Sequence, residues 1–473
     1  ASNVICRIFE MRVNVSSHDL KVSDHAHHFH PFTDHGALGV DERRVISRAD
    51  GVWLWDTDGN RIMDGMAGLW CVNVGHGRNE IVEAVRAQMS ELAYYNTFFK
   101  TSHPPVIELS EKIAEIAPDH MNMVVYGSSG SDANDTVFRM VRTYWDVMGK
   151  PEKKVIISRK NAYHGSTVAG ASLGGMGGMH GQGGLPVPGI HHIDQPYWFG
   201  EGMQTGMSEE EFGIWAAREL DKAIEEIGED KIAAFIAEPI QGAGGVIVPP
   251  ASYWPEVKKI LEARDILFVS DEVICGFGRT GEWFGANYYD TKPDFMPIAK
   301  GLTSGYLPLG GVIISDRVKE VFHRPEAGEF YHGYTYSGHP AACAAALANL
   351  EIMKREDLVG RVKNDIGPFL QKLWAELGDH DLVGEARMVG LVGAIELVPQ
   401  KSDLSKRFDN VGRVGTIARD HSFNNGLIMR AVRDSLILSP PLTLSHEEAE
   451  ELAATAKKTL DDTWKTLKAD GLV

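Results

Sequence analysis

Cysteine is scarce in this sequence. Only Cys6, Cys71, Cys275 and Cys343 occur among 473 residues. No two of them have CxxC spacing, so neither a disulfide framework nor a cysteine-based zinc site is expected. Free thiols are typical of proteins in a reducing compartment, which favours a cytoplasmic protein.

Long apolar runs and an excess of positive charge are also missing. No segment reaches the about 18 apolar residues that a membrane helix requires. The first ten residues contain Arg7 and Glu10 and lack the apolar core of a signal peptide. Met11 is a candidate for the natural start, in which case residues 1–10 are an upstream addition. The formal net charge of −18 argues against a nucleic-acid partner and against adsorption to an anionic membrane.

Histidine is concentrated in the first forty residues. Such a segment is a candidate metal site, but its spacing matches no zinc template and no cysteine lies among the histidines. We therefore interpret the segment as a polar surface arm and expect no metal site. The histidines concerned are His18, His25, His27, His28, His30 and His35.

The order of apolar segments predicts an α/β fold. Asp58-Gly59, between Val52–Asp56 and Arg61–Asp64, predicts a β-hairpin. Short and almost continuous apolar runs then alternate with amphipathic stretches. This pattern is expected for a mostly parallel sheet with helices on both faces. The predicted strands are Met123–Tyr126, Val155–Ser158, Ala233–Ala237, Ile266–Ser270 and Gly311–Ile314.

The chain beyond about residue 339 has a different pattern. Long helical stretches over Pro340–Arg355 and Ser445–Asp470 surround the short apolar runs Gly390–Leu397 and Leu436–Leu438. Helices mixed with a few short strands predict a smaller α+β domain. The glycine-rich segment Gly174–Gly184 is expected to be a mobile loop.

These patterns divide the chain into three parts. We expect residues 1–66 to form an N-terminal arm and hairpin that belong to the small domain. Residues 67–336 are expected to form the large domain. Residues 337–473 are expected to complete the small domain.

Two ionisable residues follow short apolar segments. Asp271 comes directly after Ile266–Ser270, and a carboxylate at the carboxyl end of a buried strand needs a partner. A cofactor cation is one possible partner, and a structural ion pair with Arg279 or another cation is the alternative. Lys300 follows Met296–Ala299. A partly desolvated lysine forms Schiff bases with aldehydes, whereas an ordinary lysine here is a surface residue.

A loop of small residues precedes an expected helix. Tyr126-Gly-Ser-Ser-Gly-Ser131 lies between a strand and a stretch with helical apolar spacing. Free amides at such a helix start suit a phosphate, and a plain serine N-cap is the alternative. Two further strand ends, Tyr163-His164 and Glu238–Gln241, bring an aromatic ring and polar groups to the same expected edge.

Six motifs occur in an order that spans most of the chain. They are Ser129–Asn134, Tyr163–Gly165, Glu238–Gln241, Ser270–Gly281, Ala299–Gly301 and Tyr334–Pro340. In this order they resemble the class III aminotransferases. Within that family, Gly68–Asn73, Tyr95–Lys100 and Leu427–Arg430 are similar to the ω-amino acid:pyruvate and amine:pyruvate transaminases.

The resemblance implies a fold-type I enzyme that uses pyridoxal 5′-phosphate (PLP). Such enzymes are usually homodimers, or dimers of dimers, with both active sites at the subunit interface. Lys300 is implied to carry PLP as a Schiff base and to shuttle a proton, and Asp271 to pair with the pyridinium. The other implied cofactor contacts are Val273 behind the ring, Tyr163 in front, Gly130, Ser131 and a partner-subunit Thr335 at the phosphate, and Glu238 and Gln241 beside the hydroxyl.

The resemblance also implies the substrate side of the site. Trp70 and Phe98 are implied to line the pocket, and Arg430 to pair with a substrate carboxylate and swing away for neutral amines. Arg433 is a second candidate for that pairing. The implied reaction is a ping-pong transfer from an amine or ω-amino acid to a keto acid, pyruvate, through pyridoxamine phosphate. β-Alanine, diamines such as putrescine, and arylalkylamines are all compatible donors.

Two other functions fit parts of the pattern. A PLP-dependent aminomutase or decarboxylase on the same fold shares the cofactor residues, but Trp70, Phe98 and Arg430 favour a transaminase. Gly276–Gly281 has the GxGxxG form of a nicotinamide-binding loop. That fingerprint must open a helix, and no helical periodicity follows it. The sequence therefore predicts an aminotransferase.

Overall fold

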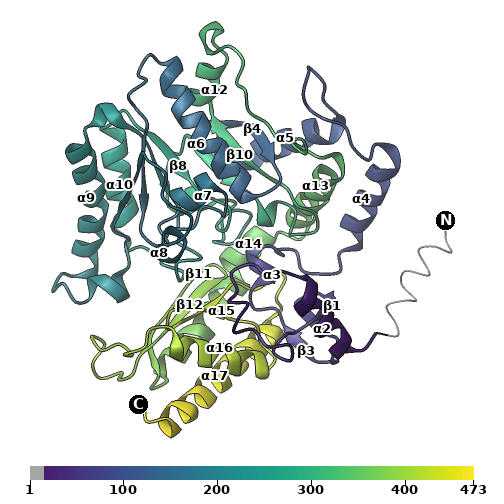
Figure 1. Cartoon of the computed structure of the whole chain (residues 1–473), viewed down its shortest axis with the longest axis vertical. Coiled ribbons are helices and arrows are strands. Elements are labelled where there is room, and N and C mark those ends of the chain that lie inside the picture. Colours follow the sequence, from purple (N-terminus) through teal and green to yellow (C-terminus); the bar gives the residue numbers. More distant parts are fainter. Residues whose placement is uncertain (1–14) are drawn as a thin grey trace.

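The computed structural model describes residues 15–473. Cys6, Arg7, Glu10 and Met11, on which some expectations rested, lie outside the described residues. Three β-sheets organise the rest of the chain, and the largest lies in the upper half of Figure 1. The three cysteines that the structure describes, Cys71, Cys275 and Cys343, form no disulfide.

The largest sheet has seven strands in the order β4-β10-β9-β8-β7-β5-β6. The pairs from β9 to β6 are parallel, whereas β10 is antiparallel to both β9 and β4. All five predicted strands are confirmed, and the mixed, mostly parallel sheet agrees with the predicted fold class. The strands are β4 Met121–Gly127, β5 Val155–Arg159, β6 Ile190–Ile193, β7 Ile232–Ala237, β8 Leu267–Ser270, β9 Phe295–Ile298 and β10 Gly310–Ser315.

Helices cover both faces of this sheet because side chains alternate along each strand. In β7, Ala234 and Ile236 pack with α6, whereas Phe235 and Ala237 pack with α9 and α10 on the opposite face. The helices of this part are α4 Asn79–Glu91, α5 Pro104–Ile116, α6 Gly130–Val147, α7 Val168–Leu173, α8 Gly177–His180, α9 Glu209–Ile227, α10 Tyr253–Glu262, α11 Gly285–Tyr288, α12 Asp316–Phe322 and α13 Pro340–Arg355.

The second sheet has four antiparallel strands in the order β11-β12-β14-β13. It lies with its helices in the lower half of Figure 1 and confirms the smaller α+β domain. Its elements are β11 Val383–Val389, β12 Val392–Leu397, β13 Arg430–Val432, β14 Ser435–Leu438, α14 Leu358–Asn364, α15 Ile366–Glu376, α16 Arg413–Asn424 and α17 His446–Ala469.

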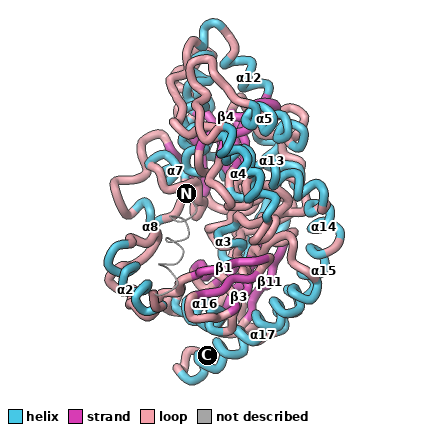
Figure 2. The backbone as a smooth tube through the Cα atoms, turned by 90° about the vertical axis from the view of Figure 1, so that its right-hand side faces the viewer, coloured by secondary structure: helices cyan, strands magenta, loops and turns pink. Residues whose placement is uncertain are grey.

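The N-terminal part pairs with the C-terminal part. The predicted hairpin is present as β2 (Trp53–Asp56) and β3 (Arg61–Met63), and β1 (Ile46–Asp50) adds a third strand that the sequence did not predict. Met63 forms a parallel bridge with Leu427. Figure 2 shows β1 and β3 in the lower half of the molecule, the half that also holds β11. The domain boundaries after residues 66 and 336 remain a prediction.

Two glycine-rich segments differ in their outcome. Gly174–Gly184 was expected to be a loop, but it contains the one-turn helix α8, because the backbone at Gly177–His180 closes a helical turn. Gly276–Gly281 opens no helix directly, and only the four-residue α11 follows. The nicotinamide-binding alternative therefore lacks its required geometry.

The remaining short elements are α2 Ser17–His27, α3 Ala67–Trp70, the π-turn Trp198–Gly202, and the 3₁₀ turns Glu229–Lys231, Lys300–Leu302, Pro325–Ala327 and Leu377–Asp379. Within residues 15–473, no helix combines the length and the apolar character needed to cross a bilayer.

Candidate active site

Polar residues follow four strands of the large sheet at the same edge. Glu238, Asp271 and Lys300 come just after β7, β8 and β9, which are parallel neighbours. Tyr163 follows β5, the next parallel strand. The carboxyl end of β4 lies at this edge too, since β10 is antiparallel to both β4 and β9. The carboxyl edge of an open α/β sheet is where ligands bind.

Asp271 is buried, and three polar groups of the chain contact its carboxylate. Its Oδ2 lies 2.7 Å from His164 Nδ1 and accepts a hydrogen bond of 2.9 Å from Asn134 Nδ2. Its Oδ1 accepts the amide of Val273 at 3.1 Å. Burial alone raises the pKa of a carboxyl group, but the bonds from His164 and Asn134 outweigh burial and hold the pKa of Asp271 below its usual value. The carboxylate is therefore ionised at neutral pH.

The alternative partner for Asp271 is not Arg279. The Arg279 guanidinium donates to Asn73 Oδ1 at 2.7 Å and to the carbonyl oxygens of Leu391 and Pro440. The ion pair with Arg279 is therefore wrong, and the side chain that lies beside Asp271 in its place is His164. Arg279 instead ties the segment after β8 to the small domain.

Lys300 begins a 3₁₀ turn directly after β9, with a positive φ of 45°. A positive φ is uncommon for a residue with a side chain and marks a position that the surrounding structure enforces. Burial lowers the pKa of the Lys300 amine, although the nearby groups of Cys71, Asp271 and Glu238 oppose that shift. A lowered pKa supplies the neutral amine that attack on an aldehyde requires.

The start of α6 is a cradle of small residues. Ser129 is the N-cap of α6, and its side chain accepts a hydrogen bond from the amide of Asp132. The serine N-cap that the sequence analysis gave as an alternative is therefore present. The first amides of a helix have no intrahelical partner, and no described side chain takes those of Gly130 and Ser131. A Cβ at Gly130 would lie 3.0 Å from Val273 Cγ1, so the residue must be small for the helix to approach Val273. This start can hold a phosphate.

Glu238 and Gln241 organise the loops around the site. Glu238 accepts the amide of Tyr163 at 3.2 Å and that of Gly242 at 2.9 Å, and burial raises its pKa. Gln241 donates to the Lys160 carbonyl and to Gln195, and its own Oε1 is buried without a partner. Both residues lie at the predicted edge.

Sequence reasoning gave no role to His164 and Asn134, which hold Asp271. Both lie inside motifs named above, Tyr163–Gly165 and Ser129–Asn134. A buried carboxylate needs hydrogen-bond donors, and this need could have pointed to them. Asn134 is one helical turn after Gly130, on the inner face of α6, and also donates to the His164 carbonyl at 2.9 Å. His164 Nε2 and Asn134 Oδ1 are themselves buried without partners.

Trp70 and Phe98, which are predicted for the substrate side, have different surroundings. Trp70 is 2% exposed and packs with Met66, Ile240 and Ile274. Phe98 is 36% exposed and lies against Gly333, in the same surface segment as Thr335. The pocket-lining role of Trp70 and Phe98 therefore remains a prediction.

The two arginines occupy different surroundings. Arg430, in β13, lies close enough to Lys300 to act on its pKa, and burial lowers the pKa of Arg430 itself. Arg433 donates to the Gly244 carbonyl at 3.3 Å, and its guanidinium lies 5.3 Å from the centre of the Tyr197 ring.

The residues of this edge fit PLP. A helix start with free amides suits its phosphate, an ionised Asp271 suits its ring nitrogen, and a desolvated Lys300 suits its aldehyde. The unpartnered atoms of His164, Asn134 and Gln241 show that the edge is not satisfied by the protein alone.

Comparison with known proteins agrees with this fit. Residues 37–460 match the model of the class-III aminotransferases, so the chain belongs to the class-III aminotransferase family. A putrescine–pyruvate aminotransferase from Pseudomonas aeruginosa is 57% identical over 450 residues, covering 95% of this chain and 97% of the relative. A diaminobutyrate–2-oxoglutarate transaminase from Halomonas elongata is 43% identical over 462 residues, covering 96% and 97%.

Solved structures show the same relationship. A thermostable (S)-enantioselective ω-transaminase from Thermomicrobium roseum superposes with a TM-score of 0.90 at 40% identity, covering 95% of this chain and 99% of the other. The fold, the family and the enzyme class predicted from the sequence are thus confirmed, and the aminomutase and decarboxylase alternatives are not favoured.

Proposed function

We propose that this enzyme uses PLP to move an amino group from a terminal diamine of the putrescine type to pyruvate. The observation that carries the proposal is the placement of Lys300 and Asp271 at the ends of neighbouring parallel strands, with Arg430 near Lys300. The putrescine–pyruvate aminotransferase at 57% identity supports the choice of donor and acceptor.

When bound, PLP supplies an electron sink for charge on the donor carbon. Lys300 would take a proton from that carbon and deliver it to the cofactor side, because its lowered pKa keeps part of the amine neutral. Asp271 stays ionised and holds a proton on the ring nitrogen. His164 and Asn134 fix the orientation of Asp271 and replace the water that burial removes.

Arg430 is the candidate for the carboxylate of pyruvate. A guanidinium binds a carboxylate through two parallel hydrogen bonds, and Arg430 lies near Lys300. Arg433 is engaged by Gly244 and Tyr197 instead. We assign the carboxylate to Arg430 and an anchoring contact to Arg433.

We also propose that two chains complete each site. Thr335 and Phe98 lie on one surface of the chain, and several aromatic residues nearby in the sequence are exposed. Clustered exposed aromatics are typical of an interface. Thr335 then serves the phosphate of the partner's site, and Phe98 lies beside it. The exposed aromatics are Tyr94, Tyr95, Phe99, Tyr331 and Tyr336.

The test is a visible spectrum of the purified enzyme with PLP. Putrescine should bleach the visible band, pyruvate should restore it, and alanine should accumulate. Replacing pyruvate with 2-oxoglutarate tests the acceptor, and Lys300→Ala is the control that should show no such band. Bleaching without recovery would refute the pyruvate assignment, and a wild-type protein that stays colourless with PLP would refute the use of PLP.

A further inference from the structure

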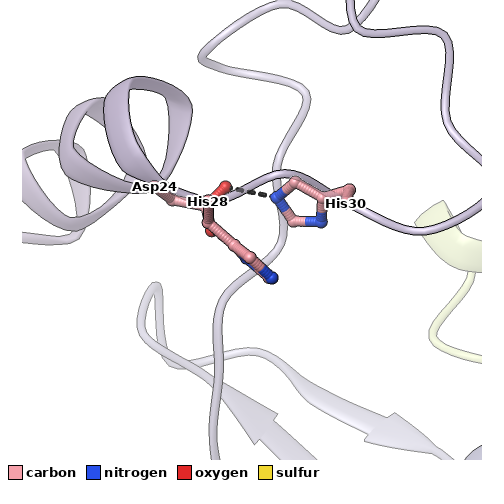
Figure 3. Close-up of side chains that lie close together, drawn as sticks. All are labelled: Asp24, His28 and His30. Carbon is pink, nitrogen blue, oxygen red and sulfur yellow. Dashed lines mark hydrogen bonds and ion pairs between the residues drawn. The ribbon is translucent and has the colours of Figure 1, made fainter.

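Three possible metal ligands converge in the histidine-rich segment, away from the strand edge described above. Asp24 lies in α2, His28 is the C-cap of that helix, and His30 follows two residues later (Figure 3). His28 Nδ1 lies 3.0 Å from Asp24 Oδ1, and His30 Nε2 lies 2.6 Å from Asp24 Oδ2. The three ligand atoms all lie within 4.8 Å of one another.

The local sequence explains the convergence. Asp24 and His28 are four residues apart, so they lie on the same face of the helix end. His28 itself is extended, with φ −111° and ψ 117°, which ends the helix. The ring of His30 lies 4.3 Å from that of His28 between centroids. We expected no metal site because the spacing of histidines and cysteines matches no zinc template. In the structure, the carboxylate of Asp24 is the third ligand beside two histidines.

A neighbouring arginine holds the carboxylate in place. Arg43 is buried, donates from Nε to Asp24 Oδ2 at 2.7 Å, and is fixed by the carbonyl oxygens of Leu38 and Gly39. Such an outer contact orients a ligand. Because its positive charge also opposes a cation, we expect micromolar rather than nanomolar binding.

The site has room for water ligands. It borders a cavity of about 820 Å³ that is also lined by Arg44, Arg419 and Phe423. The side chains of Asp24 and His30 are 23% and 28% exposed, and that of His28 is 60% exposed. An ion can therefore reach the three ligands from solvent.

We propose that Asp24, His28 and His30 bind one divalent transition-metal ion of the zinc class, with water completing the coordination shell. Two imidazoles and one carboxylate are a donor set that suits such ions. Metal–ligand bonds of about 2.1 Å place tetrahedral ligand atoms about 3.4 Å apart. The pair His28 Nδ1–Asp24 Oδ1, now 3.0 Å apart, and the pair His30 Nε2–Asp24 Oδ2, now 2.6 Å apart, therefore each need to open by less than about 1 Å.

The bound ion would fasten the chain that leaves α2. This chain leads to Phe32, whose ring lies edge-on to that of Tyr163 at 6.2 Å between centroids. An ion at Asp24 thus restrains the segment that reaches the candidate active site. This role is separate from transamination, since none of its ligands belongs to the strand-end residues.

The experiment is a calorimetric titration of the PLP-loaded enzyme with Zn²⁺, after removal of any purification tag. One equivalent should bind to the wild type. His28→Gln and His30→Gln should each weaken binding at least about 10-fold, the effect of losing a coordinating group. His27→Gln is the matched control, because His27 lies on the same helix but outside the cluster.

Thermal unfolding gives a second measurement. Zn²⁺ should raise the midpoint of the wild type and of His27→Gln, because a ligand bound only to the folded state stabilises it. At the same Zn²⁺ concentration it should raise the midpoint of His28→Gln less. The PLP band of each variant shows that it is folded, and the exposed His28 is the variant least able to disturb packing. Equal Zn²⁺ affinity in all four proteins, or no saturable binding by the wild type, would overturn the proposal.

Discussion

A buried aspartate lies at each of two opposite edges of the seven-stranded sheet, and the pKa values of the two are shifted in opposite directions. At the carboxyl edge, His164 and Asn134 hold the pKa of Asp271 below its usual value although burial opposes this. At the other edge, Asp294 precedes β9, accepts the amide of Phe268 at 3.0 Å and lies 3.5 Å from Arg317, yet burial raises its pKa. Both carboxyl groups are buried, so the donors around each one decide whether its pKa falls or rises.

The contrast extends to the remaining polar atoms. Buried atoms of His164, Asn134 and Gln241 have no partner at the carboxyl edge. At the other edge, the oxygens of Asp294 are taken by backbone and side-chain donors. Polar groups that satisfy one another stabilise a fold, whereas groups left unpaired are available to a ligand.

The largest expected effect tests whether the two edges differ in function. Lys300→Ala should lower transamination by at least about 10³-fold, because it removes the group that moves the proton. Lys292→Ala, beside the cavity at the opposite edge, is the matched control and should leave turnover unchanged. Initial rates of alanine formation measure both, and a comparable loss in the two variants would remove the distinction between the edges.

The second effect compares the two aspartates directly. Asp271→Asn should lower kcat by about 10²-fold or more, the scale seen when a preorganised electrostatic contact is lost. Asp294→Asn should leave kcat unchanged and lower the free energy of unfolding by about 1–3 kcal/mol, since hydrogen bonds inside the fold are weakened. Turnover and denaturant unfolding of both variants check this, and the reverse pattern would contradict it.

The third effect separates the two arginines of the small domain. Arg430→Ala should raise the KM for pyruvate by about 10- to 100-fold, the equivalent of one charged hydrogen-bond pair, and leave the half-reaction with putrescine unchanged. Arg433→Ala should change the KM less. Half-reactions followed by stopped-flow absorbance distinguish them, and a larger effect at Arg433 would reverse the assignment.

The smallest effect concerns stability and pH in the protein without PLP. Burial lowers the pKa of Lys300 in the folded state below its ordinary value of 10.5. At a pH between the folded pKa and 10.5, the unfolded chain therefore binds a proton that the folded chain lacks. Stability therefore rises with pH through that window. Lys300→Met lacks this dependence, so its stability advantage over the wild type should be largest below the window and shrink towards pH 10.5. Urea unfolding at several pH values measures the difference, and a constant difference would contradict the lowered pKa.

Strand ends were predictable from the sequence because they depend on local patterns. The apolar runs located β7 and β8, and the rule that parallel strands end at one edge brought Glu238 and Asp271 together. Strand β9, which precedes Lys300, was not among the predicted strands. Helix α13 has the predicted bounds because Pro340 opens it and Arg355 ends the apolar pattern.

Partners across long stretches of sequence were not predictable. Asp271 bonds to His164 and Asn134, which are more than one hundred residues away, whereas the nearby Arg279 turned out to serve other groups. Strand β1 is polar and mostly exposed, so no apolar period marks it. The meeting of Asp24 with His30 depends on how the chain turns after α2, which spacing does not encode.

The bridge between Met63 and Leu427 has a consequence for how the chain folds as it is made. Every strand of the seven-stranded sheet lies between these two residues, and domains fold as units during synthesis. The large sheet can therefore assemble on the ribosome before Leu427, the partner of Met63 in β3, has been synthesised. Joining the two ends closes the molecule late, and a ribosome stalled before residue 427 would carry a folded large sheet with a loose N-terminal segment.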